Sequence, residues 1–270
     1  MRHFRNLILA GLLWLSWTSA SQAEIIVQYD LSGVPNSAVA SVAASLQATG
    51  VTGLDLTRGT GIVATGLTNG FSANTWNGPK SLSEATDNNK YFQFGFTLGS
   101  GYTASLDTLD LSLRRSAVTA PMNMELQVSL DGFATAGTAV SSFTYFGRVS
   151  GTAPDPDPLL NDPFYYMTND LAGRPKTTTS IGDAIPTVNL SNATNLQSLV
   201  AGSEVSFRLY AWGTTNTTST NTLALGRIVG PSLYGTVTAV PEPASMSLVL
   251  GAIVAGACAR RRRTVPRFQC

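Results

Sequence analysis

A two-residue alternation of apolar and polar side chains is the feature that most limits what residues 24–239 can fold into. Successive side chains of a β-strand point to opposite faces of a sheet, so this period gives each strand one apolar face. Four runs show it, with apolar residues at Phe92, Phe94 and Phe96; at Leu109, Leu111 and Leu113; at Met124, Leu126, Val128 and Leu130; and at Phe207, Leu209 and Ala211. The pattern predicts strands that each bury one face.

Turn-forming residues separate these runs, at Gly99-Ser100-Gly101, Asp131-Gly132, Gly213 and Gly235. Glycine and aspartate favour tight turns, so short connections can reverse the chain between neighbouring strands. We therefore predict an all-β fold class, with two antiparallel sheets packed face to face as a β-sandwich. Residues 24–239 are expected to form this single domain.

Little helix is expected. Ser81 and Glu84 have the spacing of a capping box, which predicts a short helix over 82–87. The alanine-rich stretch Ser37–Gln47 predicts a second short helix. Five prolines lie within 151–176, and because proline cannot donate a backbone hydrogen bond, we expect this stretch to be a surface excursion.

Histidine and cysteine are absent from residues 24–239. The only histidine is His3, and the two cysteines are Cys258 and Cys270. This composition excludes Cys/His zinc sites, cysteine nucleophiles and histidine-containing catalytic triads from the predicted domain. Since no disulfide can form within it, the apolar core is expected to hold the domain together.

Charge is unevenly distributed along the chain. Residues 24–239 contain 10 Lys and Arg against 15 Asp and Glu, a net charge of about −5, whereas both ends of the chain are basic. A mildly acidic domain is not expected to bind phosphate backbones. The charge distribution therefore argues against nucleic acid as a partner.

The first 23 residues have the organisation of a secretory signal peptide. A basic segment with Arg2 and Arg5 precedes the apolar run Leu7–Trp17, and small residues follow at Ser21 and Ala23. We predict that signal peptidase cleaves between Ala23 and Glu24. An uncleaved N-terminal anchor is the alternative, but the apolar run is short for a membrane span.

A second membrane-directed segment ends the chain. Pro241, Glu242 and Pro243 precede an apolar run at 244–259, and a membrane-stop cluster follows at Arg260, Arg261, Arg262 and Arg263. Sixteen helical residues span about 24 Å, against about 30 Å of hydrocarbon core, so this predicted transmembrane helix is short. Basic residues stay on the cytoplasmic side. Both ends of the chain then share one side, and the domain is exported.

The order Pro-Glu-Pro, apolar helix and arginine cluster resembles the PEP-CTERM sorting signal of Gram-negative bacteria, which is also catalogued as an ice-binding-protein C-terminal domain. The resemblance covers residues 240–263. It implies processing near Pro241-Glu242-Pro243 by an exosortase, in bacteria that tend to make exopolysaccharide. The short tail 264–270 departs from the pattern. A plain C-terminal anchor without an exosortase is the alternative.

The domain also resembles a type of passenger that carries this tag. The resemblance implies a jelly-roll-like sandwich without an assigned activity. The segments that carry it are Leu56–Gly59, Asp87–Phe92, Gly101-Tyr102, Leu111–Ser116, Ser129–Phe133, Phe207–Trp212 and Leu233–Val237.

Carboxylates do not indicate an enzyme. A glycoside hydrolase needs two carboxyl groups about 5 to 9.5 Å apart. The odd spacing of Asp107 and Asp110 should send them to opposite faces of a strand. Glu84 and Asp87 are better explained as helix-capping or solvated residues, and Glu204 opens a strand. We expect no catalytic residues.

No cofactor is expected. Oxygen ligands for Ca²⁺ occur at Asp155, Asp157, Asn161 and Asp162, but their spacing matches no EF-hand loop, and solvated carboxylates are the simpler interpretation. A structural calcium ion elsewhere in the domain stays open, because such sites need no contiguous motif.

One row of side chains has two interpretations. Arg208, Tyr210 and Trp212 lie opposite the apolar face of their strand, and together with Trp76 they could stack on a sugar ring. The alternative is that the row is packed at a sheet edge or under a loop.

Three functions therefore remain. The first is a non-enzymatic surface or matrix protein, held in the inner membrane and then displayed or released. A carbohydrate-binding module with the same location is the second, and a secreted hydrolase is the third and least favoured.

Overall fold

The computed structural model describes residues 23–116, 119–145, 165–166, 183–214, 220–227 and 229–240. Their regular secondary structure is almost entirely β, and every strand pair is antiparallel except β10–β11. The strands are β1 Glu24–Gln28, β2 Leu46–Gln47, β3 Val51–Arg58, β4 Val63–Thr65, β5 Gly70–Asn74, β6 Tyr91–Leu98, β7 Tyr102–Asp110, β8 Ser112–Arg115, β9 Asn123–Ser129, β10 Thr138–Tyr145, β11 Tyr165–Tyr166, β12 Asp183–Ala184, β13 Val188–Asn189, β14 Glu204–Trp212, β15 Leu223–Gly226 and β16 Ser232–Ala239. The helices are α2 Leu82–Asp87 and a 3-10 turn at Thr194–Leu196.

Hydrogen bonding divides the strands into three sheets. The terminal sheet has the order β13-β7-β16-β1-β2, the long sheet β11-β10-β9-β14-β6-β3, and the distal sheet β12-β8-β15-β5-β4. A single residue, Leu111, separates β7 of the terminal sheet from β8 of the distal sheet. These two sheets therefore follow one another directly along the chain, where the alternation of Leu109, Leu111 and Leu113 predicted a single strand.

The long sheet turns its apolar face inward, as the alternation predicts. Phe92, Phe94 and Phe96 are fully buried, and so are their partners on β14, where Phe94 stacks on Phe207 with ring centroids 5.6 Å apart. The prediction was wrong for Leu130, which is 41% exposed. β9 ends at Ser129, so Leu130 already belongs to the turn.

Tyr29, just after β1, crosses the core to the long sheet. Its hydroxyl lies 2.6 Å from the carbonyl oxygen of Leu54 and 2.9 Å from that of Gly95, and it accepts a hydrogen bond from Gly95 N at 3.1 Å. The β3–β6 register shifts next to these residues, between Leu54 and Thr57. Backbone groups that a regular ladder would pair are therefore satisfied by a side chain.

The predicted helix at 82–87 is confirmed, together with its N-cap. The Ser81 hydroxyl accepts a hydrogen bond from Glu84 N at 3.3 Å, while the Glu84 carboxylate accepts one from Lys80 N at 2.6 Å. The predicted helix at Ser37–Gln47 was wrong. Val42 instead exchanges two backbone hydrogen bonds with Leu56 of β3, and residues 46–47 form β2. Pairing with an exposed strand edge outcompeted helix propensity.

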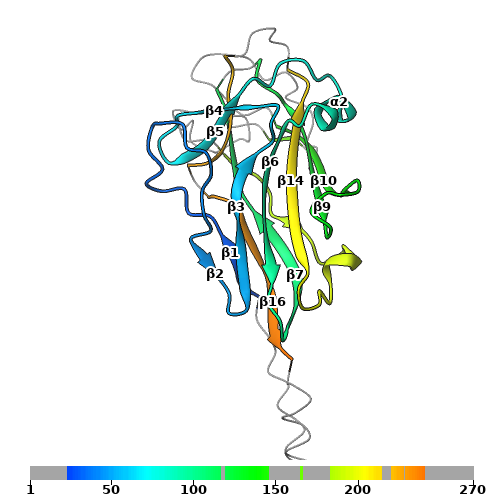
Figure 1. Cartoon of the computed structure of the whole chain (residues 1–270). Helices are drawn as coiled ribbons and strands as arrows, with labels where there is room; N and C mark the ends of the chain where they lie inside the picture. The colour runs from blue at the N-terminus through cyan, green and yellow to red at the C-terminus, as the bar shows by residue number, and fades with distance from the viewer. Residues whose placement is uncertain are drawn as a thin grey trace, which may run out of the picture.

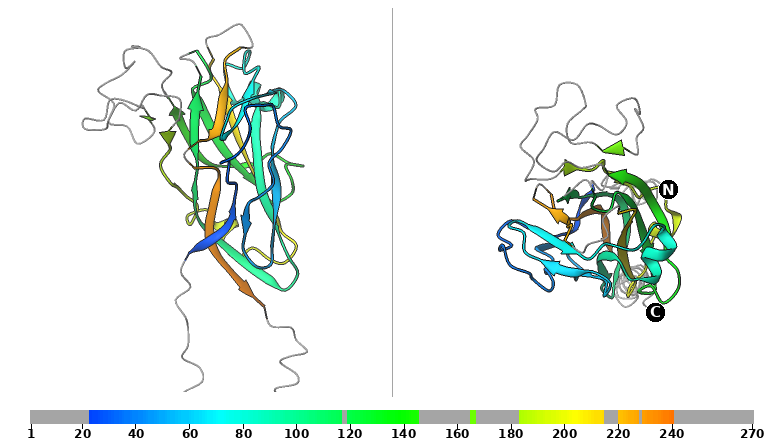
Figure 2. Two further views of the ribbon diagram at one scale, coloured as in Figure 1. Left: turned by 90° about the vertical axis from the view of Figure 1, so that its left-hand side faces the viewer. Right: turned by 90° about the horizontal axis from the view of Figure 1, so that it is seen from above.

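Both ends of the described chain lie at the same end of an elongated body (Figures 1 and 2). Strand β1 pairs antiparallel with β16, with Glu24 opposite Gly235. α2 and the β4–β5 hairpin lie at the opposite end, which we call the α2 end.

Candidate functional site

The row predicted from β14 lies on the outer face of the long sheet. Arg208 pairs with Gln93 of β6 on one side and with Gln127 of β9 on the other. Tyr210 lies opposite Tyr91 of β6, and Trp212 opposite Asn123 of β9. The outer face of these central strands is thus rich in aromatic and amide side chains.

Most side chains of this row are packed against neighbouring side chains. The Arg208 guanidinium carbon lies 4.1 Å from the ring centroids of both Tyr91 and Phe133, so the cation is sandwiched between two aromatic rings. Its Nε donates to Gln93 Oε1 at 2.8 Å, and its Nη1 lies 3.5 Å from the Tyr210 hydroxyl. Burial raises the pKa of Tyr91, and the neighbouring Tyr210 raises it further, while the positive charge of Arg208 lowers it.

Two of the four predicted glycan-contact residues are inaccessible. Tyr210 is only 2% exposed and packs against the Tyr91 ring at 5.3 Å. Trp76 was placed wrongly by the sequence: it is 1% exposed and lies in the core against Phe92, with its indole N–H donating to Ala73 O. Trp212 is partly exposed. The structure therefore favours the packed interpretation of the row.

The loop between β9 and β10 brings Phe133 over Arg208. Its turn is fixed by Ser129, whose hydroxyl accepts hydrogen bonds from Asp131 N and Phe133 N at 3.1 and 2.8 Å. The Asp131 carboxylate in turn accepts from Ser129 Oγ and from both the backbone and the hydroxyl of Thr135. These hydrogen bonds stabilise the charged form, so they lower the pKa of Asp131.

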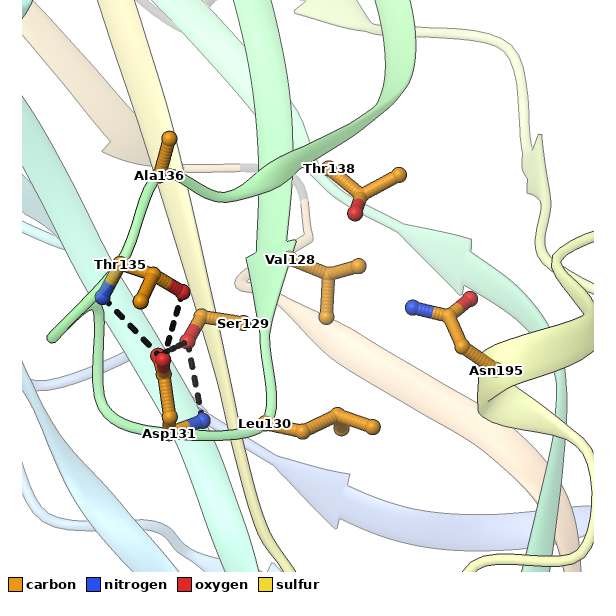
Figure 3. Close-up of a pocket in the computed structure, with 8 residues that line it drawn as sticks. All are labelled: Val128, Ser129, Leu130, Asp131, Thr135, Ala136, Thr138 and Asn195. Carbon is orange, nitrogen blue, oxygen red and sulfur yellow. Dashed lines mark hydrogen bonds between the residues drawn. The ribbon is translucent and has the colours of Figure 1, made fainter.

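A shallow hollow of about 270 Å³ borders this loop. Figure 3 shows Asp131 held by Ser129 and Thr135 on one side, with Asn195 across the gap. The remaining lining residues are Val128, Leu130, Ala136 and Thr138. The carboxylate of Asp131 is the only one in this lining, and it accepts three hydrogen bonds.

The structure changes the sequence-based argument about the carboxylates Asp107 and Asp110 of β7. The argument that Asp107 and Asp110 point to opposite faces was wrong, because the β7–β16 register shifts between Leu106 and Thr108. Leu106 and Leu109 are both buried, whereas both aspartates are partly exposed. The bulge thus restores the same outward orientation to both. Asp110 accepts a hydrogen bond from Thr187 Oγ1 at 2.6 Å.

No metal centre is evident within the described ranges, where no group of three or more His, Cys, Asp or Glu comes together. The calcium-ligand candidates Asp155, Asp157, Asn161 and Asp162 lie outside the described residues.

Sequence reasoning missed three half-buried or buried cations. Lys90 is 6% exposed and Arg115 2% exposed, and each binds backbone carbonyl oxygens: Lys90 those of Thr75 and Asn77, Arg115 those of Ala120 and Tyr145. Arg58 lies over the Phe71 ring at 3.4 Å. Burial lowers the pKa of Arg58 and of Arg115 to about 10. Arg115 continues the inward series Leu109, Leu111 and Leu113, which was a readable signal.

The sorting residues are described only in part. Ala23 is exposed, and Glu24 is the first residue of β1. Pro241, Glu242, Pro243 and Arg260 to Arg263 lie outside the described residues, as does the predicted helix at 244–259. Within the described part, no helix is long and apolar enough to span a membrane.

No protein family matches this chain, and no curated protein matches it either.

Proposed function

We propose that this protein is an exported, non-enzymatic bacterial surface or extracellular-matrix protein, associated with exopolysaccharide and sorted through its C-terminal tag. Its domain is inferred to be a jelly-roll-like β-sandwich, in which the terminal and distal sheets together form the layer opposite the long sheet. Pro241, Glu242 and Pro243 form the processing motif, 244–259 the membrane helix, and Arg260 to Arg263 the membrane-stop cluster.

The position of the two attachment points carries this proposal. β1 begins at Glu24, directly after the predicted signal cleavage, and the β7–β16 ladder continues to Ala239, directly before the tag. β1 and β16 are neighbours, and the start of β1 lies at the same end of the body as the end of β16 (Figure 1). A domain with both attachments at one end can be held at a membrane by that end, with its α2 end directed outward.

The chemistry of the domain supports a role without catalysis. Residues 24–239 contain neither histidine nor cysteine. The Arg208 row is largely used in packing, and the Asp131 carboxylate accepts three hydrogen bonds from its own turn. Display on the cell surface or matrix formation requires neither histidine nor cysteine.

Protease shaving of intact source cells tests the proposal. The full chain should be surface-exposed and digested, and a chain that ends at Val240 should be released without cell attachment. As a matched control, the triple variant Pro241→Ala, Glu242→Gln, Pro243→Ala keeps the helix and the arginines. It should accumulate in the inner membrane with its tail intact. Equal surface display of all three chains would contradict sorting by the tag.

A further inference from the structure

The loop between β5 and α2 contains an Asn-Gly pair at Asn77 and Gly78. Such pairs can deamidate: the backbone nitrogen of the glycine attacks the side-chain carbonyl carbon of the asparagine, and ammonia leaves. Water then opens the five-membered imide, which gives aspartate or isoaspartate. The reaction needs a glycine nitrogen and an asparagine side-chain carbonyl that no hydrogen bond restrains.

Asn77 and Gly78 meet both requirements. The Oδ1 atom of Asn77 is buried without a hydrogen-bond partner. Gly78 is exposed, has a φ of +109°, and has no atom within 4 Å of the position that a Cβ would occupy. Its N–H donates to no other described residue. No hydrogen bond in the described structure therefore restrains either reacting group.

The domain provides an internal comparison in Asn69 and Gly70. Asn69 Oδ1 accepts a hydrogen bond from Gly33 N at 3.0 Å, and Gly70 N donates to Leu67 O at 3.2 Å. Gly70 is also buried at the start of β5. Since attack would have to break both hydrogen bonds, the same dipeptide is protected here.

A charge at position 77 would have a partner. The Lys90 ammonium donates to the carbonyl oxygen of Asn77 at 2.8 Å and to that of Thr75, and both partners are neutral. Its side chain is only 6% exposed. A desolvated ammonium is stabilised by an opposite charge a few ångströms away. We propose that Asn77 is a deamidation site in the folded protein, and that its aspartate product supplies the counter-charge of Lys90.

Peptide mapping by mass spectrometry tests whether Asn77 deamidates. The purified full chain is incubated in detergent at mildly alkaline pH and sampled over time. Conversion should appear first at Asn77, with Asn69 roughly tenfold slower or more, because its hydrogen bonds must open first. An intact Asn77, or conversion at Asn69 at an equal rate, would overturn the assignment.

Thermal unfolding of the Asn77→Asp variant tests whether an aspartate at position 77 supplies the counter-charge of Lys90. The Asn69→Asp variant is the matched control. Asn77→Asp should raise the midpoint temperature of unfolding at neutral pH. This increase should vanish when Lys90 is also replaced by methionine. Where Lys90→Met does not fold, the pH dependence decides. A carboxyl with a pKa lowered by Lys90 stabilises above its unfolded pKa, so the gain should be lost as the pH falls through the acid range. If Asn77→Asp does not raise the midpoint temperature, or if the increase is the same at acid pH, an aspartate at position 77 is not the counter-charge of Lys90.

Discussion

At the end where the chain enters and leaves the domain, backbone ladders run to the last strand residue; at the α2 end, side-chain cations bind backbone carbonyls. β16 lies between β7 and β1, and its pairing with β7 extends to Ala239, after which Val240 N still donates to Gly101 O at 2.7 Å. At the α2 end, Lys80 and Lys90 each bind loop carbonyl oxygens, with Lys80 Nζ 2.8 Å from Thr214 O.

The difference follows from backbone regularity. Between paired strands, a ladder joins peptide N–H and C=O groups to one another, whereas irregular loops leave more carbonyl oxygens without N–H partners. One ammonium has three donors and one guanidinium has five, so a single cation can satisfy several carbonyls. The α2 end therefore depends on a few individual side chains, and the terminal end depends on the continuity of its strands.

The largest expected effect comes from breaking the terminal ladder. A chain that ends at Pro231 lacks the central strand of the terminal sheet, so β1 and β7 lose their shared neighbour. We expect no cooperative unfolding transition in urea, monitored by circular dichroism. A chain that ends at Val240 is the control and should unfold cooperatively. Cooperative unfolding of the shorter chain would contradict the role of β16.

At the α2 end, Arg115→Met should be the most destabilising single change. It leaves the carbonyl oxygens of Ala120 and Tyr145 buried without this donor, which should cost about 3 kcal/mol or more of unfolding free energy. Arg114→Met is the matched control, because that neighbour is only half-buried, and it should cost less than about 1 kcal/mol. Equal costs in urea denaturation would refute the distinction.

Tyr29→Phe tests the link between the segment that follows β1 and the long sheet. Loss of the hydroxyl should cost about 1 to 3 kcal/mol, since it leaves Leu54 O and Gly95 N–H without this partner. Burial raises the pKa of Tyr29 well above its ordinary value of 10.0. The unfolded tyrosine ionises first, so stability should fall as the pH rises above 10.0.

The difference between wild type and Tyr29→Phe isolates this contribution from those of other groups. The two unfolding free energies should converge as the pH rises above 10.0. Parallel curves over that range would show that Tyr29 does not titrate in this way.

The smallest effect concerns the outer face of the long sheet. Arg208→Met should cost about 1 kcal/mol, because it removes the cation between the Tyr91 and Phe133 rings. Trp212→Ala should leave the mobility of the protein in polysaccharide gels unchanged. Retardation of the wild type that Trp212→Ala abolishes would instead support a glycan-binding role.

The alternation in the sequence was enough to predict β6, β9 and β14 and their buried faces, because burial of one face is a local property of each strand. It could not predict the bulge at Asp107 or the end of β9 before Leu130, since both depend on the pairing register with other strands. Nor could it place Trp76 or reveal the pairing of Val42 with Leu56, because both are set by distant segments.

The candidate site was predictable to a smaller extent. That Arg208, Tyr210 and Trp212 share the outer face followed from their spacing, but the cover that Phe133 provides did not, since it depends on a loop conformation with φ +65° at that residue. The carbonyl partners of Lys90 and Arg115 were equally invisible, because backbone acceptors leave no residue-type signal.

Mass spectrometry of the mature ends of the surface-located protein tests the central claim most directly. We expect the mature protein to begin at Glu24 and to lack residues 260–270. Surface-located protein that keeps Arg260 to Cys270 would contradict it.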